Sequence, residues 1–261
     1  MNKKNYLYLK ILAALGFVGV VAVNYLANAL PIGGVTTGEA SDAFVNLFTP
    51  AGVTFSIWGL IYLLLAVYVV YQFGAFSKKI NDELIAKVNV YFILSSIANV
   101  SWIFAWHYGV IWLSVLLMLV LLVSLIRIAD ILRKESFTNI EKFCVRLPFS
   151  IYFGWITVAT IANITVFLVS LNWNGFGLSD QVWAVIILLV GAGIGIWRMM
   201  KDRNIAYGLV IVWAYLGILL KHVSEDGWAG QYTSVIVIVI ICIAALLAGN
   251  LTLVLRGKEK K

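Results

Sequence analysis

Eight stretches of the chain are each apolar over about 20 residues, the length that an α-helix needs to cross the hydrocarbon core of a lipid bilayer. A bilayer cannot satisfy an open sheet edge, so each stretch is expected to be a helix. With 62% hydrophobic and only 12% charged residues, the chain cannot cover the surface of a soluble domain. The sequence therefore predicts an all-α, polytopic membrane helix bundle. Its predicted transmembrane spans cover residues 9–30, 51–74, 88–108, 110–132, 147–171, 181–199, 205–221 and 234–255.

The basic residues are divided unevenly between the two sets of connections. Of the 19 Lys and Arg residues, 18 fall on the side that holds both chain ends, and only Lys221 falls on the other. Basic residues in short loops are retained in the cytoplasm, so both termini are predicted to be cytoplasmic, in a multi-pass protein of the cell membrane. The net charge of +7 is then explained by loops that meet anionic lipid, and no nucleic-acid partner is expected.

The connection between the first two spans, residues 31–50, is the longest one on the outer side. It is rich in Gly and Thr, and Pro31 and Pro50 stand at its ends, which is typical of a loop. A loop of about 20 residues between two helices is long for a simple connection. It is interpreted either as a lid or as an ordinary solvated connection.

Three spans each carry one face on which aromatic rings alternate with small or amide side chains at helical spacing. An amide that faced lipid would lose its hydrogen bonds, so these faces are expected to point inward. If they converge, they line a chamber that suits a large, flat, mostly apolar ligand. The alternative is that the amides and small residues join helices and that the rings lie in interfacial belts. The three faces are Phe55, Trp58, Tyr62 and Ala66; Ser95, Asn99, Trp102 and Trp106; and Tyr152, Trp155, Ala159 and Asn163.

Other residues in and near the spans receive structural interpretations. Asp130 is expected to pair with Arg127 or Arg133 or to snorkel toward the surface. Gly191 and Gly195 form a small-xxx-small pair, which favours close helix packing within the chain or in a homodimer. Tryptophans near the predicted span ends are assigned to interfacial belts: Trp112, Trp173, Trp183, Trp197 and Trp228.

The sequence gives no positive reason to expect an enzyme. It has no His/Glu metal pair, no Gly-rich phosphate loop and no pair of carboxylates within the spans. No metal site and no required cofactor are predicted. His107 at an outer edge is interpreted as an ordinary interfacial histidine. An ion-coupled transporter usually keeps an acidic residue at mid-membrane, and its absence weakens that interpretation without excluding it.

The residues on these three faces resemble the motifs of the TspO/MBR family, also called the tryptophan-rich sensory protein or translocator protein family. The resemblance covers residues 8–172. The second helix of that family carries Trp-x-x-x-Tyr, here Trp58 and Tyr62. Its third helix carries Asn-x-x-Trp, here Asn99 and Trp102, and a further aromatic residue matches Trp106. The pattern of its fifth helix is matched at the expected spacing by Tyr152, Trp155, Ala159, Thr160 and Asn163.

The chain also departs from the family pattern. Ile151 and Ser56 stand where the family has prolines, and three further spans follow the five-helix module. The resemblance therefore implies a TspO-like ligand-binding module at 1–172 and a three-helix membrane extension at 173–261.

By the same resemblance, the ligand would be a porphyrin or haem-type tetrapyrrole or a similar flat hydrophobic molecule, bound for sensing or transport. A secondary transporter or permease for another small molecule and a structural subunit without a ligand stay open as alternatives. The residues implied in ligand binding are Trp58, Tyr62, Asn99, Trp102, Trp106, Tyr152, Trp155, Ala159 and Asn163.

Overall fold

The computed structural model describes residues 3–30, 32–77 and 80–258. Of the residues on which the sequence predictions rest, Pro31, Lys78, Lys79, Lys260 and Lys261 lie outside this part of the chain.

Within the described residues, eight helices are long and apolar enough to cross a membrane, and each corresponds to one predicted span. This part of the chain contains helices, turns and connections and no strand, which confirms the all-α prediction. The long helices are α1 (Lys3–Ala29), α3 (Ile57–Tyr71) with the 3₁₀ turn η2 (Gly52–Ser56) before it, α4 (Asp82–His107), α5 (Ile111–Leu132), α7 (Leu147–Ser170), α8 (Asp180–Asp202), α9 (Ile205–Val223) and α10 (Thr233–Lys258). The short elements are η1 (Ile32–Gly34), α2 (Thr37–Asp42), α6 (Asn139–Glu141), the π-helical turn η3 (Lys142–Arg146) and η4 (Gly175–Gly177).

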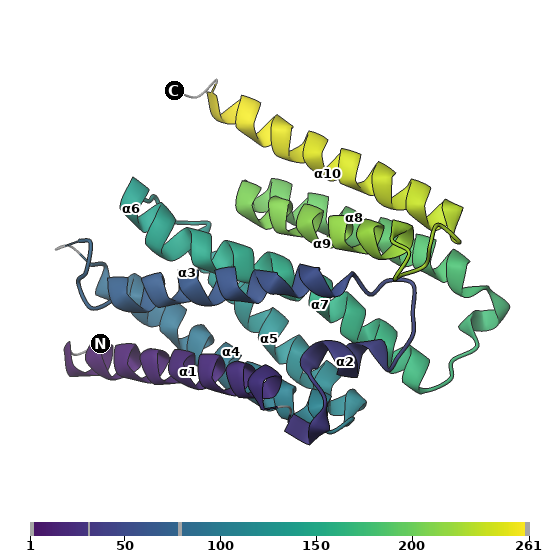
Figure 1. Ribbon diagram of the computed structural model, residues 1–261. Helices are drawn as coiled ribbons and strands as arrows, with labels where there is room; N and C mark the ends of the chain where they lie inside the picture. Colours follow the sequence, from purple (N-terminus) through teal and green to yellow (C-terminus); the bar gives the residue numbers. More distant parts are fainter. Residues whose placement is uncertain (1–2, 31, 78–79, 259–261) are drawn as a thin grey trace.

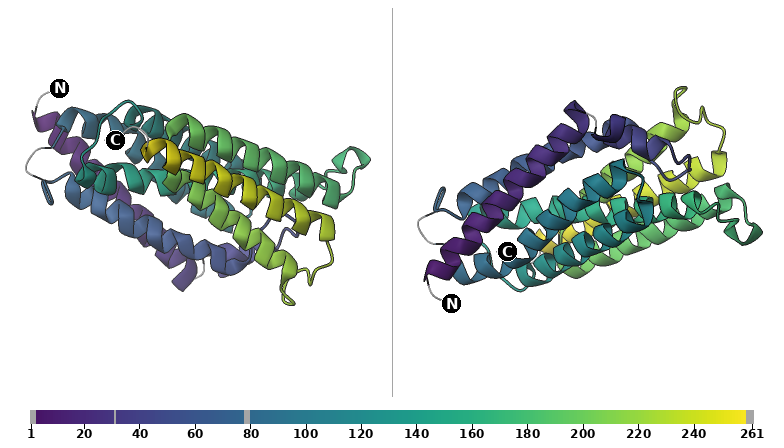
Figure 2. Two further views of the ribbon diagram at one scale, coloured as in Figure 1. Left: turned by 90° about the horizontal axis from the view of Figure 1, so that it is seen from above. Right: turned by 90° about the horizontal axis from the view of Figure 1, so that it is seen from below.

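The long helices run along a common direction, and the start of α1 and the end of α10 lie at the same end of the bundle (Figure 1, Figure 2). We call this the terminal end, and we call the opposite end, which carries α2, the loop end. An even number of spans returns the chain to its starting side, as the predicted topology requires. That the terminal end faces the cytoplasm stays a prediction.

The packing order places α7 at the centre of the molecule. Helix α1 packs on α4, α4 on α5, α5 on α7 and α7 on α9, while α8 and α9 both pack on α10. Helix α3 packs on α7 and α1. Because α7 contacts α3 and α5 on one side and α9 on the other, it connects the first five spans to the last three.

Polar caps explain where several spans begin. The side chains of Asn81, Ser179 and Asn204 accept hydrogen bonds from backbone N–H groups in the first turns of α4, α8 and α9. Such caps satisfy N–H groups that have no partner within the helix. These helix starts therefore follow from local sequence.

Glycines set the close approach of the last helices to the rest of the bundle. A Cβ on Gly154 of α7 would stand 2.9 Å from Val210 Cβ of α9. A Cβ on Gly191 of α8 would stand 2.7 Å from the hydroxyl of Tyr215 on α9, and Gly195 packs on α9 and α10. The predicted small-residue pair thus serves close packing within the chain. The homodimer stays a prediction.

Candidate functional site

The α3 face forms one wall of an aromatic cluster near the middle of the first five spans. Trp58 stacks on Tyr62, with ring centroids 5.5 Å apart and planes at 23°. Its ring also lies edge-on to Tyr152 and Trp155 of α7, at 6.0 Å and 6.3 Å. Phe55, one turn earlier, meets Trp155 edge-on at 5.7 Å. Edge-to-face contacts at these distances are favourable, so the aromatic faces of α3 and α7 stabilise each other.

The α4 face forms the opposite wall and is tied to α5 and α7 by amide hydrogen bonds. Trp102 and Trp106 stack with centroids 5.4 Å apart. The indole N–H of Trp102 donates to Asn163 Oδ1 at 2.9 Å, and Asn163 Nδ2 donates to the hydroxyl of Ser114 at 2.8 Å. Asn163 therefore satisfies groups on two neighbouring helices at once.

Asn99 plays a similar part between α1, α4 and α7. Its Oδ1 accepts from Nδ2 of Asn24 at 2.8 Å, and its own Nδ2 donates to the hydroxyl of Tyr152 at 3.2 Å. Asn24 is the polar residue that the sequence interpretation missed. Its signal was an amide within the long apolar run of the first span.

The inward orientation predicted for the polar α4 face is confirmed. Ser95, Asn99, Trp102 and Trp106 are all buried. The structure brings all nine sequence-predicted residues together around the facing surfaces of α3, α4 and α7. That they bind a ligand stays a prediction.

An open groove of about 720 Å³ runs between α1 and α3 beneath the start of α2. Drug-sized ligands occupy pockets of about 300–1,000 Å³, so this groove has the size of a ligand site. Trp58 and Tyr62 lie on its wall, as does Asn24 from the amide network. The lining residues are Val21, Asn24, Tyr25, Asn28, Ala29, Thr36, Thr37, Gly38, Gly52, Phe55, Trp58, Gly59 and Tyr62.

A smaller cavity of about 50 Å³ lies beside the groove, between the loop, α4 and α7. Two residues, Thr37 and Phe55, line both spaces. Five of the nine predicted residues line this smaller cavity. Its volume is only a small fraction of the volume of the groove. Its lining residues are Thr37, Ser41, Thr49, Pro50, Phe55, Trp102, Trp106, Trp155, Val158, Ala159, Ala162, Asn163 and Val166.

The first half of the loop is held against the end of α4. Ile32 O accepts from Nδ1 of His107 at 2.9 Å, so that nitrogen carries a proton, and Nε2 of the same ring shares a hydrogen bond with the hydroxyl of Thr37 at 3.0 Å. The indole N–H of Trp106 donates to Thr37 O at 3.2 Å. His107 thus holds the first half of the loop against α4 through two hydrogen bonds. The sequence did not predict this role, because the position of His107 at a span end is also that of an ordinary interfacial histidine.

Helix α2 inside this loop begins with a capping box. Thr36 N–H donates to Glu39 Oε2 at 2.7 Å, and Glu39 N–H donates to Thr36 Oγ1 at 3.3 Å. The hydrogen bond from the Thr36 backbone, followed by that from its side chain, lowers the pKa of Glu39 below its ordinary value. The loop segment over the cavity therefore has local order of its own.

Two polar atoms in the aromatic cluster lack a partner. Among the described residues, nothing hydrogen-bonds the hydroxyl of Tyr62 or the indole N–H of Trp155, although both atoms are buried. Leaving a buried donor unpaired costs about 1–3 kcal/mol. These two donors are therefore the groups in the site that gain most from an acceptor on a ligand.

The five tryptophans assigned to belts differ in their surroundings. Trp112 and Trp197 are 57% and 60% exposed, as a belt residue would be in the absence of lipid. Trp183 instead packs on Trp173, with centroids 4.9 Å apart and planes tilted at 55°, and its indole N–H donates to Gly175 O. Both rings line a further space of about 350 Å³ between α7, α8 and the second half of the loop.

A partly buried ionic cluster joins α5 to α8 near the terminal end. Arg198 donates to Asp130 and to Asp202, both at 2.7 Å, while Arg133 lies 4.0 Å from Asp130 and 3.5 Å from Asp202. The expectation that Asp130 pairs within its own helix is thus incomplete, because its shortest contact is to an arginine 68 residues away. The geometry of the fold, rather than local sequence, decides this pairing.

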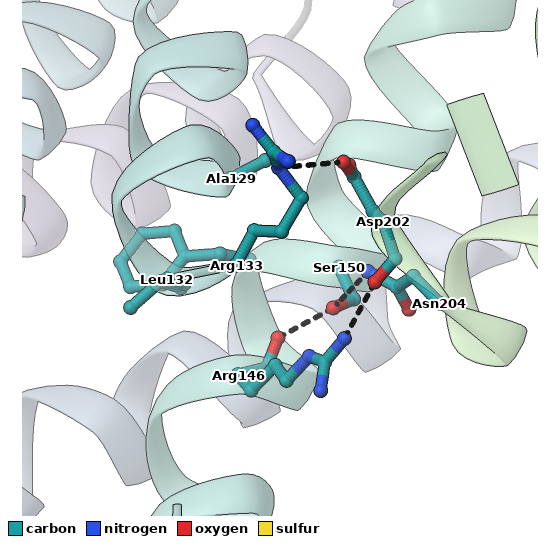
Figure 3. A pocket seen from close by; sticks show the side chains of 8 residues that line it. Ala129, Leu132, Arg133, Arg146, Ser150, Asp202 and Asn204 are labelled. Carbon is teal, nitrogen blue, oxygen red and sulfur yellow. Dashed lines mark hydrogen bonds and ion pairs between the residues drawn. The ribbon is translucent and has the colours of Figure 1, made fainter. Parts of the chain in front are cut away.

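Figure 3 shows the small space beside this cluster. Arg146 Nη2 donates to Asp202 O at 2.8 Å, and Asn204 Nδ2 donates to Ser150 Oγ at 2.7 Å, so α7 is tied to the turn between α8 and α9 (Figure 3). The space measures about 10 Å³, which is room for about one water molecule. This cluster therefore fastens the last three helices to the first five and offers no ligand site.

No group of three or more His, Cys, Asp or Glu side chains within the described ranges could hold a metal ion. The site itself presents aromatic surfaces and a few hydrogen-bonding groups.

The comparison with protein families agrees with this geometry. The family model described as TSPO-like protein matches residues 10–252. The chain belongs to this family. The match confirms the resemblance found from the sequence, and it extends beyond residue 172 through most of the last helix. No match to this TSPO-like chain was found among curated proteins or among solved structures. The division into a module at 1–172 and an extension at 173–261 stays a prediction.

Proposed function

We propose that this TSPO-like membrane protein binds a flat, largely apolar ligand of the tetrapyrrole class in the groove between α1 and α3, for sensing or transport. The observation that carries the proposal is the pair of unpaired donors, Tyr62 Oη and Trp155 Nε1. Tyr62 lines the groove of ligand size, and Trp155 lines the adjoining smaller cavity. A tetrapyrrole offers a broad π-face to stack on Trp58 and peripheral carboxylates to accept from these donors.

The other polar atoms of the cluster support a structural role for the asparagines and a ligand-binding role for the aromatic residues. Asn99 and Asn163 already have partners, so they stabilise the helix arrangement that positions the rings. Ala159 is a small residue that lines the smaller cavity together with Trp155 and Trp102. In the proposed complex, the aromatic residues contact the ligand, and the asparagines keep the helices in position through their interhelical hydrogen bonds.

Titration of the purified protein with protoporphyrin IX, followed by quenching of tryptophan fluorescence, tests the proposal. We expect saturable binding near one ligand per chain. Tyr62→Phe should weaken it about three- to tenfold, the effect of one hydrogen bond, without lowering thermal stability. Tyr68→Phe is the matched control, because the Tyr68 hydroxyl donates to Asn89 at 2.7 Å. Loss of this hydrogen bond should lower stability and leave porphyrin affinity unchanged.

Other outcomes would favour the alternative functions. Linear, non-saturable quenching would contradict a chamber and favour partitioning into detergent or a structural subunit. Flux of another small molecule in proteoliposomes, without porphyrin binding, would favour a permease. Protection of the loop at residues 31–50 from added protease by the porphyrin would support its role as a lid, and equal cleavage with and without porphyrin would contradict it.

A further inference from the structure

The second half of the loop is attached to α9, not to the helices that surround the groove. Ala51 N–H donates to Gly217 O at 3.0 Å, and the indole N–H of Trp213 donates to Thr54 O at 3.0 Å. These bonds join segments more than 150 residues apart in the chain. They fix the backbone of the turn that leads into α3.

The contact between Gly217 and Thr54 leaves no space for a side chain on α9. A Cβ on Gly217 would overlap Thr54 Oγ1 and stand 2.7 Å from Thr54 Cγ2. Thr54 is itself only 1% exposed. The glycine is required here because the Thr54 side chain packs directly against α9, so any larger residue must displace this side chain or the η2 turn that carries it.

A third bond extends this attachment toward the loop end. Leu47 O accepts from Nε2 of the buried His222 at 2.9 Å. Leu47 and Phe48 are buried as well, so this half of the loop is packed into the bundle instead of lying on its surface. The ring of His222 is backed by Tyr232, at 6.0 Å between centroids. Three bonds from one helix therefore hold the segment from residue 47 to residue 54.

Phe55 follows directly after this segment. This residue lines both the groove of about 720 Å³ and the smaller cavity of about 50 Å³, and its ring meets Trp155 edge-on. The ring therefore stands between the two spaces. Any displacement of the η2 turn would move this ring and alter the boundary between them.

We infer that α9 is a positioning element of the ligand chamber: through Trp213, Gly217 and His222 it holds Phe55 as a partition that limits the size of ligand the chamber accepts. The size limit rests on the function proposed above, whereas the positioning of residues 47–55 does not. This assigns to the last three helices a specific task at the site formed by the first five.

Hydrogen–deuterium exchange of the ligand-free protein tests the positioning role. Gly217→Ala should speed exchange in the peptide covering residues 47–55 about three- to tenfold, because the bond at Ala51 N–H is weakened. Gly193→Ala is the matched control: it is also a glycine in a membrane helix, but a Cβ there meets nothing within 4 Å. Thr54→Ala combined with Gly217→Ala should restore part of the slower exchange, because it removes the two nearest atoms, Oγ1 and Cγ2, and leaves only the Cβ at 2.8 Å.

If Gly217→Ala does not fold, Trp213→Phe replaces it, with the exposed Trp197→Phe as its control. Trp213→Phe keeps an apolar ring and removes only the bond to Thr54 O, so it should give a smaller acceleration in the same peptide. Unchanged exchange at 47–55 in the folded variants would overturn the positioning role.

Binding of two porphyrins tests the size limit. The probes are protoporphyrin IX and the bulkier tetraphenylporphyrin tetrasulfonate. Gly217→Ala, or Trp213→Phe in its place, should shift the ratio of their dissociation constants at least about threefold toward the bulkier probe, and Phe55→Ala should shift it further, since loss of one aromatic contact has this scale. Faster exchange with an unchanged ratio would overturn the partition. If the wild-type protein binds neither porphyrin, the proposed function and the size limit both fall, while exchange alone decides the positioning role.

Discussion

The α4 wall and the α3 wall of the chamber carry similar side chains but leave their polar atoms in different states. On the α4 wall, the indole N–H of Trp102 and both ends of the Asn163 amide have partners. On the α3 wall, Tyr62 Oη is buried without one among the described residues, and so is Nε1 of Trp155, the α7 residue that packs on Trp58 of that wall. A satisfied network stabilises a fold, whereas an unpaired buried donor lowers stability unless something else binds it. Residues of one type can therefore serve architecture on one wall and recognition on the other.

The largest expected effect comes from breaking the satisfied wall. Asn163→Ala leaves the indole N–H of Trp102 without its acceptor and removes a donor to Ser114. We expect unfolding in detergent to become easier by about 2 kcal/mol, within the range for an orphaned buried group. Asn250→Ala is the control, because Asn250 is equally buried but its amide N–H bonds only to Leu246 O of its own helix. Equal losses would contradict a special role for the network.

Removing an unpaired donor should give the opposite pattern. Trp155→Phe deletes an indole N–H that has no described partner, so stability should fall by only about 1 kcal/mol, through the smaller ring packed on Phe55 and Trp58, while porphyrin affinity falls about tenfold through loss of the N–H and of ring area. Thermal unfolding and fluorescence titration of the same sample separate the two effects. A large loss of stability with unchanged affinity would remove Trp155 from the recognition wall.

Trp102→Phe should combine both effects at smaller size. The change shrinks the stack with Trp106 and frees Asn163 Oδ1, so stability and porphyrin affinity should each fall by about 1 kcal/mol. Trp112→Phe, at a position 57% exposed, controls for nonspecific quenching. Equal losses of affinity at the two positions would indicate partitioning and would count against the chamber.

The smallest effect is expected at the loop that covers the α4 wall. The pKa of Glu39 is lowered because its carboxylate accepts from Thr36, so the capping box stabilises α2 at pH values above the ordinary range of a carboxyl group. That contribution is lost as the pH falls through the lowered pKa. The protection of residues 36–42, measured relative to the intrinsic amide exchange rate at each pH, should therefore fall on acidification, while that of residues 47–54, held by α9, should change less. An equal response in both halves would show that the loop moves as one unit.

Several features of the fold and the site could be read from sequence because their causes are local. Hydrophobic runs of the right length mark eight helices, and the helical spacing of Ser95, Asn99, Trp102 and Trp106 is sufficient to show that this face avoids lipid. The ordered motifs on successive helices likewise identified the family before any geometry was known.

What the tertiary structure alone decided is which of these inward groups meet. Periodicity places Trp102 and Trp155 on inward faces alike, but only packing gives one indole N–H an acceptor and leaves the other without. The contacts of Arg198 with Asp130 and of Trp213 with Thr54 join residues 68 and 159 positions apart, and no local pattern encodes such distances. The physical reason is that a helix face is set by dihedral angles within one segment. A hydrogen bond between helices, in contrast, depends on atoms from two segments standing about 3 Å apart, which only the assembled bundle determines.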